Sequence, residues 1–200
     1  MKRFALLFLL ALALPMAAFA SSSVDFTNVG GTLSGSSAGL SLSGSTLAVM
    51  GVNGSMITGN LGTLEFSTAG MQSGGSLQMG ATFDAGGAFT ITGNGTNGVH
   101  NGTIFSGTFS GPVTWTLVTL ANGTHNYTLS GALTGTWYTG ATVFGATIQI
   151  TINTGKGFFS GSTLISSGDT NIVVPEPGSL TLLGTGLVGL AGVVRRKLKA

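Results

Sequence analysis

Val-Thr-Trp-Thr-Leu-Val-Thr-Leu-Ala-Asn-Gly-Thr-His-Asn-Tyr-Thr-Leu-Ser-Gly-Ala-Leu, residues 113–133, contains two alternating segments on either side of one turn. In the first segment Val113, Trp115 and Leu117 alternate with threonines, which is typical of a strand with one buried and one hydrated face. Asn122-Gly123 separates the segments, and Asn-Gly is the strongest short signal for a hairpin because both residues accept positive φ. The sequence therefore predicts an antiparallel hairpin of strands 113–120 and 125–133.

The same alternation recurs on both sides of this hairpin. In Ile148-Gln149-Ile150-Thr151-Ile152 the three isoleucines fall on one face of a strand. Two further hairpins are predicted, one through Asp84–Gly87 and one through Asn153–Gly155. Short strands separated by glycine-rich turns favour an all-β fold, an antiparallel β-sandwich or open barrel. The predicted strands are 63–68, 76–83, 88–92, 103–110, 113–120, 125–133, 143–152 and 157–165.

Two parts of the body show weaker patterns. Residues 30–60 are rich in Gly and Ser and low in bulky side chains, so they predict an irregular edge with a weak hairpin around Gly44. Residues 166–174 predict a tether that leads out of the domain. The sequence thus places the sheet mainly between residues 63 and 165.

Charged residues make up 6% of the chain, and most of the basic ones lie near its two ends. Between Ser21 and Val174 the only base is Lys156, against four acids, which gives a net charge of −3. Such a body lacks the basic surface that neutralises phosphates, so we expect no nucleic-acid partner. The chain contains no cysteine, which excludes a thiol nucleophile and thiolate metal ligands.

The N-terminus has the three parts of a secretory signal peptide. Lys2 and Arg3 are followed by an apolar run, residues 4–14, and then by Ala18-Phe19-Ala20, an A-x-A cleavage site. We therefore predict that residues 1–20 are removed by the general secretion machinery, with Ala18 and Ala20 as the cleavage determinants.

The C-terminus has an apolar run and a basic end. Leu180–Val194 is followed by Arg195, Arg196 and Lys197. At 1.5 Å per residue the run spans roughly 22 Å, short of the about 30 Å of a bilayer core. We predict a single short transmembrane helix, residues 178–194, with the basic residues as a membrane stop on the cytoplasmic side.

Val174-Pro175-Glu176-Pro177-Gly178-Ser179-Leu180, the glycine-rich apolar run and the basic end together resemble a PEP-CTERM sorting signal of Gram-negative bacteria. The resemblance implies recognition by an exosortase, cleavage near Pro175, Glu176 and Pro177, and transient residence in the inner membrane. It divides the chain into a signal peptide (1–20), an exported β domain (21–173) and a sorting signal (174–200). The alternative is an ordinary single-span anchor that is kept intact.

Few side chains between these ends are candidates for chemistry. His100 and His125 lie 25 residues apart without a neighbouring acid, and no Gly-x-Ser-x-Gly elbow occurs. We therefore expect no catalytic residue, metal or cofactor. Trp137 and Tyr138, with Trp115, are candidates for stacking on a sugar, with a place in the core as the alternative.

These observations favour an exported, exosortase-sorted surface or extracellular-matrix protein without catalytic activity. The main alternative is a carbohydrate-binding β-sandwich module whose partner is an extracellular polysaccharide. A secreted hydrolase is a third class, since carboxylates on distant strands can pair in a fold.

Overall fold

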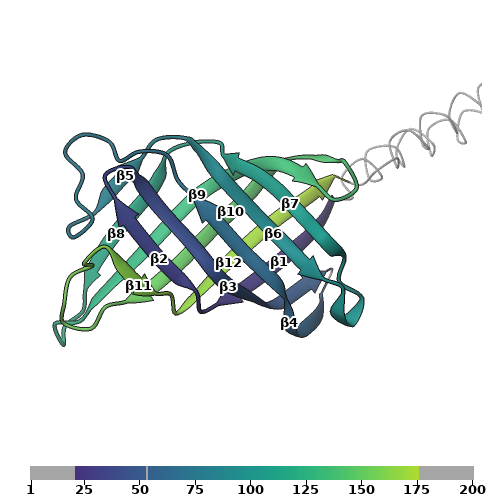
Figure 1. Cartoon of the computed structure of the whole chain (residues 1–200), viewed down its shortest axis with the longest axis horizontal. Helices are drawn as coiled ribbons and strands as arrows, with labels where there is room; N and C mark the ends of the chain where they lie inside the picture. Colours follow the sequence, from purple (N-terminus) through teal and green to yellow (C-terminus); the bar gives the residue numbers. More distant parts are fainter. Residues whose placement is uncertain (1–20, 53, 176–200) are drawn as a thin grey trace, which may run out of the picture. The chain divides into compact units, whose positions relative to one another are not determined.

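The computed structural model describes residues 21–52 and 54–175, which form twelve strands and one 3-10 turn (Figure 1). The elements are β1 (Ser21–Val29), β2 (Thr32–Ser36), β3 (Gly39–Val52), β4 (Ser55–Ser67), β5 (Ala81–Phe83), β6 (Gly86–Asn94), η1 (Thr96–Gly98), β7 (Asn101–Phe109), β8 (Val113–Thr119), β9 (His125–Trp137), β10 (Thr142–Asn153), β11 (Ser162–Leu164) and β12 (Ser167–Pro175). Residues 23–174 form one compact unit.

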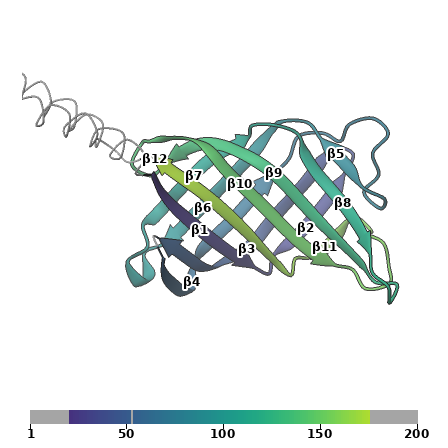
Figure 2. The same cartoon turned by 180° about the vertical axis from the view of Figure 1, so that it is seen from behind.

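Eight of these strands close into a ring. Their order is β1-β12-β10-β9-β7-β6-β4-β3, and β3 pairs in turn with β1. The two views of the ribbon show strands on both sides of one closed barrel (Figures 1 and 2). The prediction of an all-β, antiparallel fold is confirmed, and of the two predicted architectures the barrel is correct and the sandwich is wrong. The barrel is closed rather than open, because the β1–β3 pairing leaves no open edge in the ring.

Most of residues 30–60 lie in β3 and β4, which belong to the ring, so the predicted irregular edge was wrong for this part; residues 32–36 form β2, which pairs with β3 outside the ring. β3 is the longest strand, with 14 residues, and it pairs with β4, β2 and β1. Leu40, Leu42 and Leu47 are buried, whereas Ser41, Ser43 and Gly44 are exposed; Ser45 is also buried, and its hydroxyl accepts a hydrogen bond from the Asn28 side-chain amide at 2.7 Å. The register with β4 shifts between Leu42 and Ser45 and again between Leu47 and Val49. At the first shift β3 has one extra residue, and at the second β4 has two; such irregularities break the period of two, which hides a strand from pattern counting.

Residues 166–174, predicted as a tether, form most of β12. This strand lies between β1 and β10 and completes the ring (Figure 2). Thr170, Ile172 and Val174 are buried, whereas Asp169 and Val173 are exposed on the other face. The alternation is regular, but the inward positions also include Gly168 and Thr170, and these small residues made the apolar pattern weak.

The hairpin at Asn122-Gly123 is confirmed. β8 pairs with β9 from Thr114↔Ser130 to Thr119↔His125, and Gly123 has a φ of +78°. The Asn122 side-chain oxygen accepts hydrogen bonds from the backbone N–H and the hydroxyl of Thr124. We call the end of the barrel with this hairpin the far end, and the end where β12 finishes at Pro175 the exit end.

The other two predicted hairpins were wrong. Of the predicted strand 76–83 only β5 is extended, and it pairs with β8 rather than β6. Gly86 and Gly87, at the start of β6, have positive φ of 111° and 76°, and the strand that follows them pairs with β4. A Cβ at Gly87 would lie 2.0 Å from the Ser67 carbonyl oxygen. Of the predicted strand 157–165 only β11 is extended, and it pairs with β2 rather than β10.

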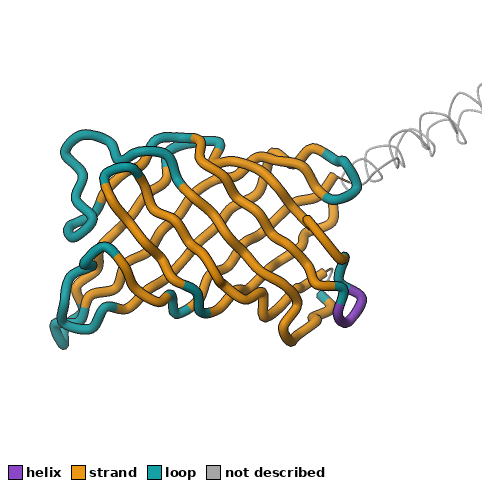
Figure 3. The backbone as a smooth tube through the Cα atoms, viewed as in Figure 1, coloured by secondary structure: helices purple, strands orange, loops and turns teal. Residues whose placement is uncertain are grey.

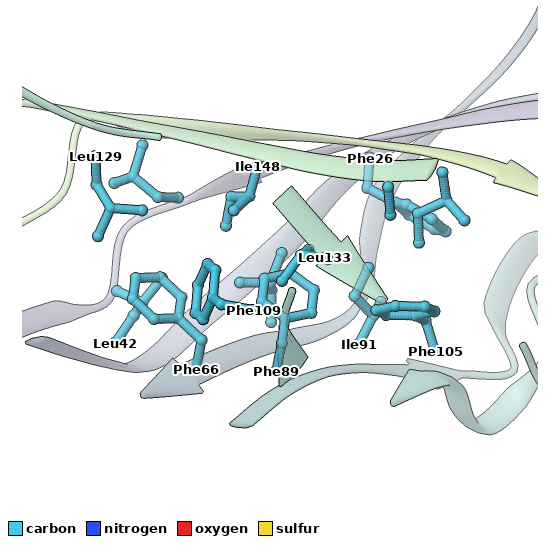
Figure 4. Packing of buried hydrophobic residues seen from close by; sticks show 14 of the residues in the cluster. Phe26, Leu42, Phe66, Phe89, Ile91, Phe105, Phe109, Leu129, Leu133 and Ile148 are labelled. Atoms are coloured by element: carbon cyan, nitrogen blue, oxygen red, sulfur yellow. The ribbon is translucent and has the colours of Figure 1, made fainter. Parts of the chain in front are cut away.

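The interior of the barrel is filled by side chains (Figure 4). Phe66 and Phe89 are stacked at 6.2 Å, and both meet Phe109 edge-on at 5.9 and 6.3 Å. In Figure 4 these rings lie opposite Ile148 and Leu129 from the other side of the ring. A barrel of eight strands is just wide enough to be filled in this way.

Two loops cover the far end (Figure 3). The first joins β4 to β5 and the second joins β10 to β11. Trp115 donates its indole N–H to the Leu77 carbonyl oxygen at 2.8 Å. The Tyr127 hydroxyl donates to the Gln78 carbonyl oxygen at 2.7 Å and accepts the Phe159 backbone N–H at 3.1 Å. Tyr127 therefore links both loops to the barrel.

Candidate functional site

The predicted sorting motif begins where the last barrel strand ends. β12 runs through Pro175, and the Val174 side chain is only 7% exposed. Glu176 and Pro177 lie outside the described residues. β12 extends two residues beyond position 173, where the sequence placed the end of the β domain, so the motif directly adjoins the barrel without a spacer.

Hydrogen bonds on the outer face connect β12 to β1. Asn171 donates its side-chain amide to the Ser23 hydroxyl at 3.0 Å and also to the Asp25 carboxylate. The Thr27 hydroxyl donates to the Asp169 carboxylate at 2.9 Å. On its other side β12 pairs with β10 from Thr147↔Asn171 to Thr151↔Ser167. A cut at or after Pro175 would remove none of these contacts.

The remaining targeting residues lie outside the described residues. They are the signal-cleavage residues Ala18 and Ala20 and the membrane-stop residues Arg195, Arg196 and Lys197. The predicted helix 178–194 also lies there. Among residues 21–52 and 54–175, no helix has the length and apolar character needed to cross a bilayer.

The two candidate sugar-stacking residues differ in exposure. Trp137, at the end of β9, is 6% exposed and packs against Phe26 with ring centroids 6.1 Å apart. Tyr138 is 50% exposed, and one face of its ring stacks on His100 at 4.4 Å. Trp115 is buried and stacks on Tyr127 at 4.9 Å. Of the three rings, Tyr138 alone has substantial surface open to a ligand.

The two histidines are at opposite ends of the barrel. His100 precedes β7 at the exit end, whereas His125 begins β9 at the far end. His125 is buried, its Nδ1 lies 3.2 Å from the Gly157 carbonyl oxygen, and its ring stacks on Phe158. No group of three or more His, Cys, Asp or Glu side chains with metal-binding geometry occurs within the described part of the chain.

The acidic residues reveal a surface feature that the sequence analysis missed. Asp25 and Asp169 lie on neighbouring strands and line a groove of about 610 Å³ together with Asn171, Gln149 and Thr147. The groove crosses β1, β12 and β10 on the outside of the barrel and continues to β9 and β8, where Ser130 and Thr114 line it. Asp169 and Asn171 fall in the segment predicted as a tether. Their alternation with the buried residues Thr170 and Ile172 was the signal that could have identified this segment as a strand.

Comparison with known families gives a match at the C-terminal end of the chain. The PEP-CTERM protein-sorting motif matches residues 173–197. No curated protein and no solved structure matches the chain. The match covers Pro175, Glu176 and Pro177 and the apolar and basic segments after them, in agreement with the resemblance stated from the residues. The chain therefore carries a PEP-CTERM protein-sorting motif at residues 173–197, and this motif implies an exported product that an exosortase sorts to the cell surface or extracellular space.

Proposed function

We propose that this chain is a non-enzymatic surface or extracellular-matrix protein. The chain crosses the inner membrane through the general secretion machinery, and its C-terminal segment then holds it at that membrane. An exosortase then cuts near Pro175, Glu176 and Pro177. The observation that carries this proposal is the position of the Pro-Glu-Pro tripeptide within the motif, because its first residue, Pro175, is the last residue of β12, a strand of the closed ring.

The filled interior supports a structural role. An eight-stranded barrel that serves a small molecule holds it inside. Here the inward-facing positions are occupied by packed side chains, among them Phe89 and Phe105 with ring centroids 5.9 Å apart. The apolar residues of this barrel therefore stabilise the fold, and its outer surface is the part available to partners.

The outer surface is rich in hydroxyl groups. Cross-strand pairs place four threonines in one row over four adjacent strands: Thr46↔Thr63, Thr63↔Thr92 and Thr92↔Thr103. Neighbouring residues in such a row are about 4.8 Å apart, the spacing between strands. A hydroxyl surface binds water without the mutual repulsion of like charges. This property suits a protein that accumulates at high density among polysaccharides.

Substitution of the motif tests the proposal. We expect a variant with alanine at Pro175, Glu176 and Pro177 to stay in the inner membrane with its C-terminal segment attached, because two prolines hold the backbone extended for a protease cleft. Thr116→Ala, an exposed change on β8, is the matched control and should be processed normally. Normal release of the triple-alanine variant, measured by fractionation and intact mass, would contradict the proposal.

A carbohydrate-binding role is the second candidate, and the groove over β1, β12 and β10 favours it. Gln149, Asn171 and two carboxylates there offer both donors and acceptors to sugar hydroxyls. Co-sedimentation with extracellular polysaccharide from the producing cells would test this role. Loss of binding in Gln149→Ala would assign it to the groove, and loss in Tyr138→Ala would assign it to the exposed ring at the exit end. Retention in both variants would count against a site at either place.

A further inference from the structure

Three exposed apolar side chains lie close to the point where the chain leaves the barrel. Phe144 on β10 is 80% exposed, Val173 on β12 is 38% exposed, and Tyr138, directly after β9, is 50% exposed. β12, β10 and β9 are consecutive strands of the ring (Figure 2). A Cβ at Gly145, the neighbour of Phe144, would lie 3.9 Å from the Cβ of Val173. We call Tyr138, Phe144 and Val173 the exit rim.

A bulge exposes Phe144. Val143 pairs with Gly135 and Ala146 pairs with Leu133, so two residues of β10 face one residue of β9. The Thr134 hydroxyl donates to the Val143 carbonyl oxygen at 3.0 Å and helps to hold this arrangement. Because a bulge redirects side chains, Phe144 and Gly145 are both exposed instead of alternating in and out.

The length of the connecting chain limits how far the exit rim can lie from a membrane that holds the C-terminal segment. Five peptide units separate Pro175 from Leu180, the first residue of the apolar run. Fully extended, five units span at most about 17 Å. β10 alone has 12 residues, so its two ends are up to about 36 Å apart along the strand. The exit end is therefore held near the membrane surface, whereas the far end reaches that surface only if the barrel lies on its side.

We propose that, before exosortase cleavage, the exit rim contacts the phospholipid surface of the inner membrane. This inference rests on the proposed membrane-held precursor. The connections at the exit end, residues 53–54, 95–100 and 138–141, contain no Asp, Glu, Lys or Arg, so approaching the headgroups desolvates no charged side chain of these connections. Tyrosine at the edge of such a contact suits the interfacial region, which favours aromatic rings with a polar group.

The proposal predicts that exposed position 144 contacts lipid and that exposed position 164 does not. The chain has no native cysteine, so Phe144→Cys and Leu164→Cys each provide one labelling site. Leu164 on β11 is 70% exposed and serves as the matched control at the far end. The full-length precursor, labelled with the fluorophore NBD, is reconstituted into phosphatidylethanolamine–phosphatidylglycerol vesicles that contain spin-labelled lipids. Circular dichroism checks that both variants are folded.

We expect NBD at position 144 to shift its emission to the blue and to lose intensity to the spin labels, at a depth about 5–10 Å into the headgroup and acyl boundary. NBD at position 164 should stay in water. Flotation of the vesicles in a density gradient distinguishes failure of the exit-rim contact from failure of membrane retention. If the precursor floats with the vesicles but position 144 stays unquenched, or both positions are quenched alike, the exit-rim contact is wrong and the sorting proposal stands. If the precursor does not float, membrane retention is wrong and the contact falls with it.

Discussion

Removing one buried hydroxyl should weaken the far end of the barrel. In Tyr127→Phe the Gln78 carbonyl oxygen loses the hydroxyl donor at 2.7 Å and the Phe159 N–H loses its acceptor at 3.1 Å. The net contribution of one hydrogen bond to stability is about 0.5–1.5 kcal/mol, so loss of both bonds should lower the free energy of unfolding by about 2 kcal/mol. For a body of this size that corresponds to a fall in Tm of about 4–8 °C.

The assay is urea unfolding of the exported body, residues 21–175, followed by tryptophan fluorescence. Trp115 stacks on Tyr127 at 4.9 Å and therefore reports on the same end of the barrel. Tyr138→Phe is the matched control, since Tyr138 is half exposed and its hydroxyl can bond to water. A Tyr127→Phe protein within about 0.5 kcal/mol of the parent, the usual range for a neutral surface change, would refute the reasoning.

Two further changes test how the ring is closed. Gly107→Ala should destabilise the barrel by about 1–3 kcal/mol, because the new Cβ would lie 2.1 Å from the Thr134 carbonyl oxygen on β9. The control Gly111→Ala should be tolerated, since no atom lies within 4 Å of the Cβ at that position. Equal urea midpoints for the two variants would contradict the close packing of β7 on β9. A chain that stops after Ser166 lacks β12 and should fail to give the cooperative unfolding of a chain that stops after Pro175. Cooperative unfolding of the shorter chain by circular dichroism would show that β12 is dispensable.

The parts of the fold that the sequence predicted correctly are those with local signals. The hairpin of 113–133 is specified by alternation on both sides of Asn122-Gly123, and β8 and β9 pair as expected. The strand predicted at residues 148–152 is also confirmed, because these residues lie in β10 and their three isoleucines all face inward and are buried.

The ring closure could not be predicted because it depends on contacts between distant residues. β1 meets β12 through Thr27 and Asp169, which are 142 positions apart. The inward face of β12 mixes Gly168 and Thr170 with apolar residues, and bulges interrupt β3, so neither strand has a long regular pattern. The partners of β5 and β11 were wrong for a related reason, since the nearest strand in sequence is not the neighbour in the sheet.

The candidate site divides in the same way. The sorting motif was found from contiguous residues, and the family match agrees with it. In the groove, Asp25 of β1 is far in sequence from Gln149 of β10 and Asp169 of β12, and only the folded ring brings these three residues together. Likewise, Trp137 is buried as the last residue of β9, whereas Tyr138 is half exposed because it begins the turn after this strand; residue type alone does not distinguish the two.

The intact mass of the protein recovered from the surface or medium of the producing cells tests the account most directly. We predict a product that begins at Ser21 and ends within the sorting motif after Val174, so that β12 is retained and the apolar and basic segments are gone. A product recovered from the cytosol with Met1 and Ala200 both present would contradict export and sorting together.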